Sequence, residues 1–231
     1  MPTRRTGRRC PTSALAPGIG THVDGDLKKY MDTNENLKAQ TAQVGTNPHN
    51  VAAISYLGYV APEGPDGKIY QAANISYADE AAPDLARFEE GLRASGNFIM
   101  CGSPGAGAES TDQYNIPEGH VYKSSVPEGD AVQGVGPDSE YSTNPKKLSS
   151  ITHLSGDTTD SENYKIPGED YVHNTGHPFK QAADILGTPF LNHDTYFDED
   201  TRTSQDFSNI IAGGKQTTDD EWAAIEIERS K

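Results

Sequence analysis

The chain has 231 residues, of which 33% are hydrophobic, and its formal net charge at pH 7 is −15. This length is enough for one α/β domain, although apolar residues for a core are few. Nucleic acid is not expected as a partner, because binding phosphate backbones requires a basic surface. The basic start at residues 1–9 is not followed by an apolar stretch, and no later stretch is long enough to span a membrane. We therefore expect a cytoplasmic protein.

The residue types that usually hold metals or cofactors are poorly arranged in this sequence. Cys10 and Cys101 lie far apart, and Cys101 ends an apolar run, which indicates buried packing rather than a nucleophile. His173 and His177 are separated by a Thr-Gly pair that disfavours a helix. The acidic run at 194–200 lacks the spacing of a calcium loop and is interpreted as a solvated charge run. We expect no metal and no cofactor.

The first part of the chain alternates between strand and helix patterns. Residues 1–16 are interpreted as a disordered or eroded segment with a poor strand at 13–16, followed by a tight glycine loop at 17–22. Apolar spacing predicts a surface helix over 26–43, capped by Asp24 or Asp26. A strand is predicted over 51–59.

The middle of the chain carries the clearest strand signal. Pro and Gly residues predict a loop over 60–78, and an apolar stripe predicts a helix over 79–94 that ends at Ser95-Gly96. Residues 97–101 predict a buried strand that runs into the glycine-rich turn 102–107, and a shorter strand is predicted over 120–126.

The last part of the chain is mostly polar. Residues 127–176 are interpreted as a lid-like excursion or a disordered segment, because so long a structureless loop is unusual in a compact domain. Helices are predicted at 178–186 and 203–212, the latter closed by Gly213-Gly214, and a further helix within the acidic tail 215–231. Strands that alternate with helices predict an α/β fold with a mostly parallel sheet covered on both faces.

Seven fragments, taken in order, resemble one family. The fragments are Pro17–Thr21, Ala53–Tyr59 with Ala61-Pro62, Ala82–Ala94, Cys101–Gly107, Pro117–Tyr122, Pro127–Val132 and His193–Asp198. The family that they resemble is the actinobacterial alpha/beta hydrolase family of unknown function, a lipase- and esterase-like group. The resemblance implies a hydrolase domain over 17–214 and a Ser-Asp-His triad in that chain order. It implies that Asp130 orients the imidazole, that His193 is the general base, and that Gly18, Ile19, Gly20 and Thr21 form the oxyanion loop.

The sequence departs from the family where the nucleophile belongs. The family places a Gly-x-Ser-x-Gly elbow between the helix ending near Ala94 and the strand beginning at Asn97, and no serine of this chain sits in that motif. A missing strand, elbow and helix amount to roughly 30 residues or more, the size of a crossover unit. Without this central strand, its former neighbours must pair directly or the sheet must split.

Several functions remain open at this point. The first is a truncated serine esterase or lipase relative with little or no activity. The second is a weak esterase with a recruited serine such as Ser103, which sits in Gly102-Ser103-Pro104-Gly105. The third is a non-catalytic module that binds an acyl or ester small molecule or a protein partner, and the fourth is a decayed gene product. Each site residue also has an ordinary interpretation: Asp130 and Ser103 as turn residues, His193 as a polar loop residue, and 18–21 as a tight turn.

Overall fold

The structure is a computed structural model of the whole chain. It describes residues 12–16, 23–44, 51–56, 76–77, 79–80, 83–84, 87–88, 97–103, 105, 107–114, 116–126, 130, 132, 138–166 and 192–231.

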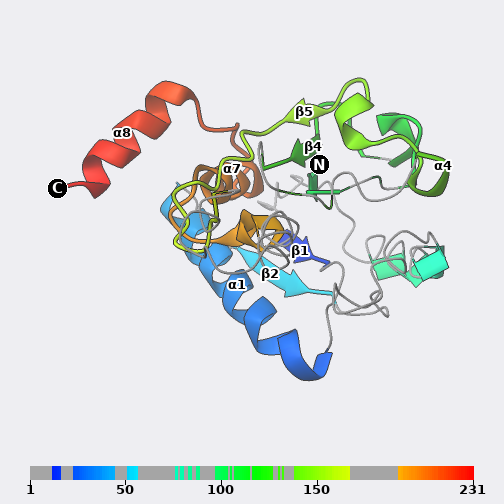
Figure 1. Cartoon of the computed structure of the whole chain (residues 1–231), viewed down its shortest axis with the longest axis horizontal. Helices are drawn as coiled ribbons and strands as arrows, with labels where there is room; N and C mark the ends of the chain where they lie inside the picture. Colours follow the sequence, from blue (N-terminus) through cyan, green and yellow to red (C-terminus); the bar gives the residue numbers. More distant parts are fainter. Residues whose placement is uncertain are drawn as a thin grey trace, which may run out of the picture.

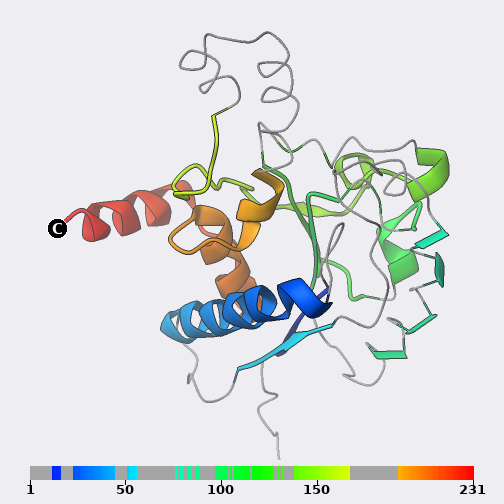
Figure 2. The same cartoon turned by 60° about the horizontal axis from the view of Figure 1, so that its bottom comes forward.

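The N-terminal part forms a strand–helix–strand unit. Strands β1 (Thr12–Leu15) and β2 (Ala52–Ser55) pair in parallel, and helix α1 (Val23–Gln43) lies between them in sequence and packs against β2. Figure 2 shows α1 alongside this strand pair. The predicted helix over 26–43 and the strands at 13–16 and 51–59 are confirmed within the described residues. The predicted caps were wrong, because Asp24 and Asp26 lie inside the first turn, where carboxylates favour the positive end of the helix dipole.

A second parallel sheet follows in the order β3 (Phe98–Cys101), β4 (Val121–Ser124) and β5 (Thr152–His153). The predicted strands at 97–101 and 120–126 are confirmed. In the described part of the chain the strands therefore lie in two separate sheets, and no hydrogen bond joins β2 to β3. Of the two outcomes named in the sequence analysis, direct pairing or a split sheet, the described strands show two sheets.

The polar stretch after β4 is not the lid-like or disordered excursion that its composition indicates, at least over residues 138–166. These residues form helix α4 (Asp138–Tyr141), the short helix η4 (Pro145–Lys147) and β5. Leu148 and Leu154 are buried in different clusters, Leu148 with Met100 and Leu154 with Phe207. The prediction failed because widely spaced single leucines anchor the segment, and such anchors produce no periodic pattern.

Two helices complete the described chain (Figure 1). Helix α7 (Arg202–Ile211) packs against α1 and contributes Phe207 and Ile210 to the larger apolar cluster. It confirms the helix predicted over 203–212. Gly213 then adopts a φ of +84°, a left-handed conformation that commonly ends helices. Helix α8 (Asp219–Arg229) follows in the predicted acidic tail and begins with a capping box formed by Thr218 and Glu221.

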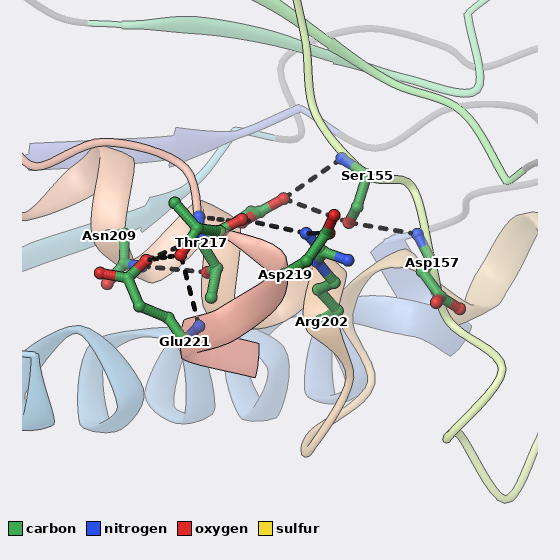
Figure 3. A network of polar contacts seen from close by, with 9 residues as sticks. Ser155, Asp157, Arg202, Asn209, Thr217, Asp219 and Glu221 are labelled. Atoms are coloured by element: carbon green, nitrogen blue, oxygen red, sulfur yellow. Dashed lines mark hydrogen bonds and ion pairs between the residues drawn. The ribbon is translucent and has the colours of Figure 1, made fainter. Parts of the chain in front are cut away.

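A polar network that includes Ser155, Arg202 and Thr217 attaches the start of α8 to the rest of the fold (Figure 3). Asp206 of α7 is 1% exposed and accepts hydrogen bonds from the backbone N–H of Ser155 at 3.2 Å and of Thr217 at 2.7 Å. Nearby, Arg202 donates to the carbonyl of Thr217 and to the Asp219 carboxylate. The loop after β5, α7 and the segment leading into α8 therefore share one polar network.

These elements place the protein in the α/β class with parallel strands, as predicted. Part of the predicted helix over 79–94 is described, and residues 79–80, 83–84 and 87–88 are helical. Residues 76–77 are also helical, so the predicted loop over 60–78 was wrong at that point. Several features of the sequence analysis lie outside the described residues: Cys10, the loop at 17–22, the histidines at 173 and 177, and the helix at 178–186. Within the described ranges, no helix is both long and apolar enough to cross a bilayer.

Candidate active site

Asp130 and His193, which are 63 positions apart in sequence, meet in the structure. Asp130 lies in the loop after β4, and His193 lies in the short helix η5 (Asn192–Phe197). The Nδ1 atom of His193 is 3.2 Å from Oδ1 and 3.1 Å from Oδ2 of Asp130. The Asp130 side chain is fully buried, whereas the His193 side chain is 24% exposed. The fold thus joins a buried carboxylate to an imidazole that reaches solvent.

The carboxylate determines which histidine nitrogen can act as a base. An ionised carboxylate only accepts hydrogen bonds, so Nδ1 of neutral His193 carries the proton when it faces Asp130. The Nε2 atom then keeps its lone pair, and it has no hydrogen-bond partner among the described residues. This tautomer and orientation are those required of a general base whose imidazole is oriented by an acid.

Tyr196 is a further member of the site that the sequence analysis did not identify. Its hydroxyl donates to Asp130 Oδ2 at 2.6 Å and accepts from the backbone N–H of Val126 at 2.9 Å. Its ring meets the His193 ring edge-on, with centroids 5.7 Å apart. Burial, and then the Asp130 carboxylate, raise the pKa of Tyr196, so it remains a protonated donor. The signal in the sequence was the His-x-x-Tyr spacing, because residues three apart align on a 3₁₀-helix.

The Asp130 carboxylate is held from the other side by its own loop. The backbone N–H of Val132 donates to Asp130 Oδ1 at 2.9 Å. Together with Tyr196 and His193, this contact gives both carboxylate oxygens donors, which a fully buried charge requires.

Gly102, directly after β3, lies against the same pair. A Cβ atom at this position would lie 2.3 Å from Asp130 Oδ2 and 2.6 Å from His193 Nδ1. Its φ of +57° is also left-handed. Only glycine therefore fits without displacing the pair, and the glycine-rich turn after the third strand is explained by this close approach.

Ser103 and Cys101 flank Gly102, but neither is arranged as a nucleophile. The Ser103 hydroxyl donates to the Gly105 carbonyl at 2.7 Å and accepts from the Gly105 N–H at 3.2 Å, so it closes its own turn. Burial, with a smaller effect of Asp130, raises the pKa of the Cys101 thiol to about 12. A thiol with such a pKa is uncharged at neutral pH and is a poor nucleophile. The predicted oxyanion loop, residues 18–21, lies outside the described residues.

Acidic side chains near the site form ordinary protein contacts. Asp198 accepts hydrogen bonds from Ser161 and Asn163, and Asp200 pairs with Arg229. The described residues contain no group of three or more His, Cys, Asp or Glu side chains that could hold a metal ion.

Parallel strands with connecting helices place the protein in the α/β class, and the Asp130–His193 contact lies in the segments that follow these strands. The comparison with known families agrees with this class. The sequence model of a family described as alpha/beta hydrolase matches residues 10–98, which is less than half of the chain. The match ends at the first residue of β3, so Asp130 and His193 lie beyond it. No curated protein and no solved structure gives a significant match.

Proposed function

We propose that this protein is an internally shortened alpha/beta-hydrolase relative of the serine esterase or lipase type, with little or no catalytic activity. The family match supports a hydrolase-type lineage. The observation that carries the proposal is the Asp130–His193 pair, whose Nε2 has no serine hydroxyl bonded to it among the described residues. The acid and the base would thus be in place without the group that they activate.

The roles within this proposal follow the triad mechanism. Asp130 would fix the tautomer of His193, and His193 would take a proton from a serine and return it to the leaving group. A serine without an adjacent base is a weak nucleophile, and the strained Gly-x-Ser-x-Gly elbow that would present one is not in the sequence. The ligand class that this lineage implies is an acyl or ester small molecule.

A fluorophosphonate probe tests the proposal, because it labels only activated serines. The purified full chain is first shown to be folded by a cooperative thermal transition, and any modified residue is then located by mass spectrometry. We expect no labelling, and no turnover of a short-chain aryl ester that depends on His193.

Two variants identify the nucleophile if labelling does occur. Ser103→Ala removes the candidate beside Gly102, and Ser149→Ala removes an exposed serine as a matched control. Labelling that is lost in Ser103→Ala and kept in Ser149→Ala would contradict the proposal and establish a recruited nucleophile. Turnover abolished by His193→Ala would contradict it in the same way.

A further inference from the structure

A lysine is buried in the central strand of the three-stranded sheet. Lys123 lies in β4 between β3 and β5 and is 7% exposed. The hydrogen bond that its Nζ atom makes is long, 3.5 Å to Ser125 Oγ. Burying an ammonium group costs free energy unless a counter-charge or strong hydrogen bonds compensate for it. This position therefore requires an explanation beyond packing.

Two further basic side chains belong to the same face of this sheet. His153 of β5 is the register partner of Lys123, and paired residues of neighbouring strands project from the same face. Lys146 comes from η4, and Leu148 directly after η4 packs against Val121. Val121 lies two residues before Lys123 in β4, so both project from the same face and η4 lies over that face. The opposite face, with Tyr122 and Val126, belongs to the larger apolar cluster.

The electrostatic effects agree with this grouping. Burial lowers the pKa of Lys123, and the positive charge of Lys146 lowers it further. Burial also lowers the pKa of His153, and Lys123 adds to that effect. Lys146 thus disfavours the positive charge of Lys123, and Lys123 disfavours that of His153.

Acidic partners are available in this chain, whose net charge is −15. Lys147, the neighbour of Lys146, pairs with Asp138 at 2.6 Å, and Arg202 pairs with Asp219 at 2.6 Å. Within the described residues, by contrast, Lys123, Lys146 and His153 form no ion pair with a carboxylate. In so acidic a protein, a basic cluster without a carboxylate partner among the described residues indicates a site for an external anion.

We propose that Lys123, Lys146 and His153 bind the phosphate group of a small soluble molecule. Two ammonium groups and an imidazole complement a doubly charged oxyanion better than a single carboxylate, and the Ser125 hydroxyl adds a donor. An anionic membrane is disfavoured as the source of the phosphate, because the overall negative charge of the protein repels it. The site shares no residue with the Asp130–His193 pair and does not depend on hydrolase activity.

Thermal unfolding of the full chain tests the site. Inorganic phosphate is titrated against chloride at constant ionic strength, and a bound anion raises the unfolding midpoint in a saturable manner. Lys146 is exposed, so Lys146→Met removes one charge without disturbing the core. We expect this change to weaken phosphate affinity about tenfold, the loss of one charge-assisted hydrogen bond. Lys123→Met is expected to abolish the stabilisation by phosphate. If this variant of a buried residue does not fold, Lys146→Met still tests the site, because Lys146 is exposed.

Lys215→Met is the matched control, because Lys215 is exposed and its loss changes the net charge equally. It should leave the phosphate response unchanged. A rise of the unfolding midpoint no greater in phosphate than in chloride would overturn the proposal. An equal loss of phosphate affinity in Lys215→Met and Lys146→Met would overturn it as well. Glycerol phosphate should reproduce the response. Binding to vesicles containing phosphatidic acid without a response to glycerol phosphate would overturn the assignment to a soluble ligand.

Discussion

Replacing Gly102 by alanine tests the packing of the Asp130–His193 pair most directly. The new Cβ would lie 2.3 Å from Asp130 Oδ2 and 2.7 Å from His193 Cε1, so one of the two side chains must move. The left-handed φ of +57° costs an alanine about 1–2 kcal/mol, and overpacking in a buried site costs about 1–3 kcal/mol more. We therefore expect Gly102→Ala to lower the free energy of unfolding by about 2–5 kcal/mol.

Gly213→Ala is the control for the backbone effect alone. Gly213 has a φ of +84°, and a Cβ there would meet no atom within 4 Å. Urea denaturation followed by circular dichroism measures both variants, and the His193 ring signals in NMR report whether the imidazole is displaced. Equal destabilisation by the two substitutions, with unchanged His193 signals, would refute the packing of Gly102 against the pair.

The remaining predictions concern buried polar groups. Tyr196→Phe removes the hydroxyl that accepts from the Val126 N–H and donates to Asp130, and should lower the free energy of unfolding by about 1–3 kcal/mol in the same urea assay. Asp206→Ala leaves the N–H groups of Ser155 and Thr217 without acceptors and should cost about 2–4 kcal/mol. Cys101 should resist iodoacetamide at neutral pH until the protein unfolds, because its pKa is raised to about 12. Rapid alkylation of Cys101 in folded protein, located by mass spectrometry, would contradict that burial.

Regular elements of this fold were predictable where the apolar pattern is strong. The spacing in α1 and α7 indicates helices, and the uninterrupted run before Gly102 indicates β3. β5 was not predicted, because only Thr152 and His153 pair with β4 and neither residue is apolar. Its position is determined by the buried Leu154 that follows, and a single apolar residue does not identify a strand.

The candidate site was only partly predictable, for a different reason. Gly129-Asp130 has the composition of an ordinary turn, and nothing near His193 in the sequence distinguishes it from a polar loop histidine. Both residues were identified through family resemblance, and the contact between them depends on tertiary structure. The His-x-x-Tyr spacing indicates only that Tyr196 lies beside His193, whereas the contacts of Tyr196 and Gly102 with Asp130 depend on atoms far away in sequence.

The presence of the Asp130–His193 pair does not by itself require catalysis. The carboxylate of Asp130 satisfies the Tyr196 hydroxyl and the Val132 N–H, and the Tyr196 hydroxyl in turn satisfies the Val126 N–H. Removing Asp130 would leave buried donors without acceptors, at a cost of about 1–3 kcal/mol each. The pair therefore stabilises the junction between the loop after β4 and η5 whether or not a substrate is turned over. A folded protein with an intact Asp130–His193 pair but no labelled serine is consistent with this geometry, because the hydrogen bonds of Asp130 stabilise the fold.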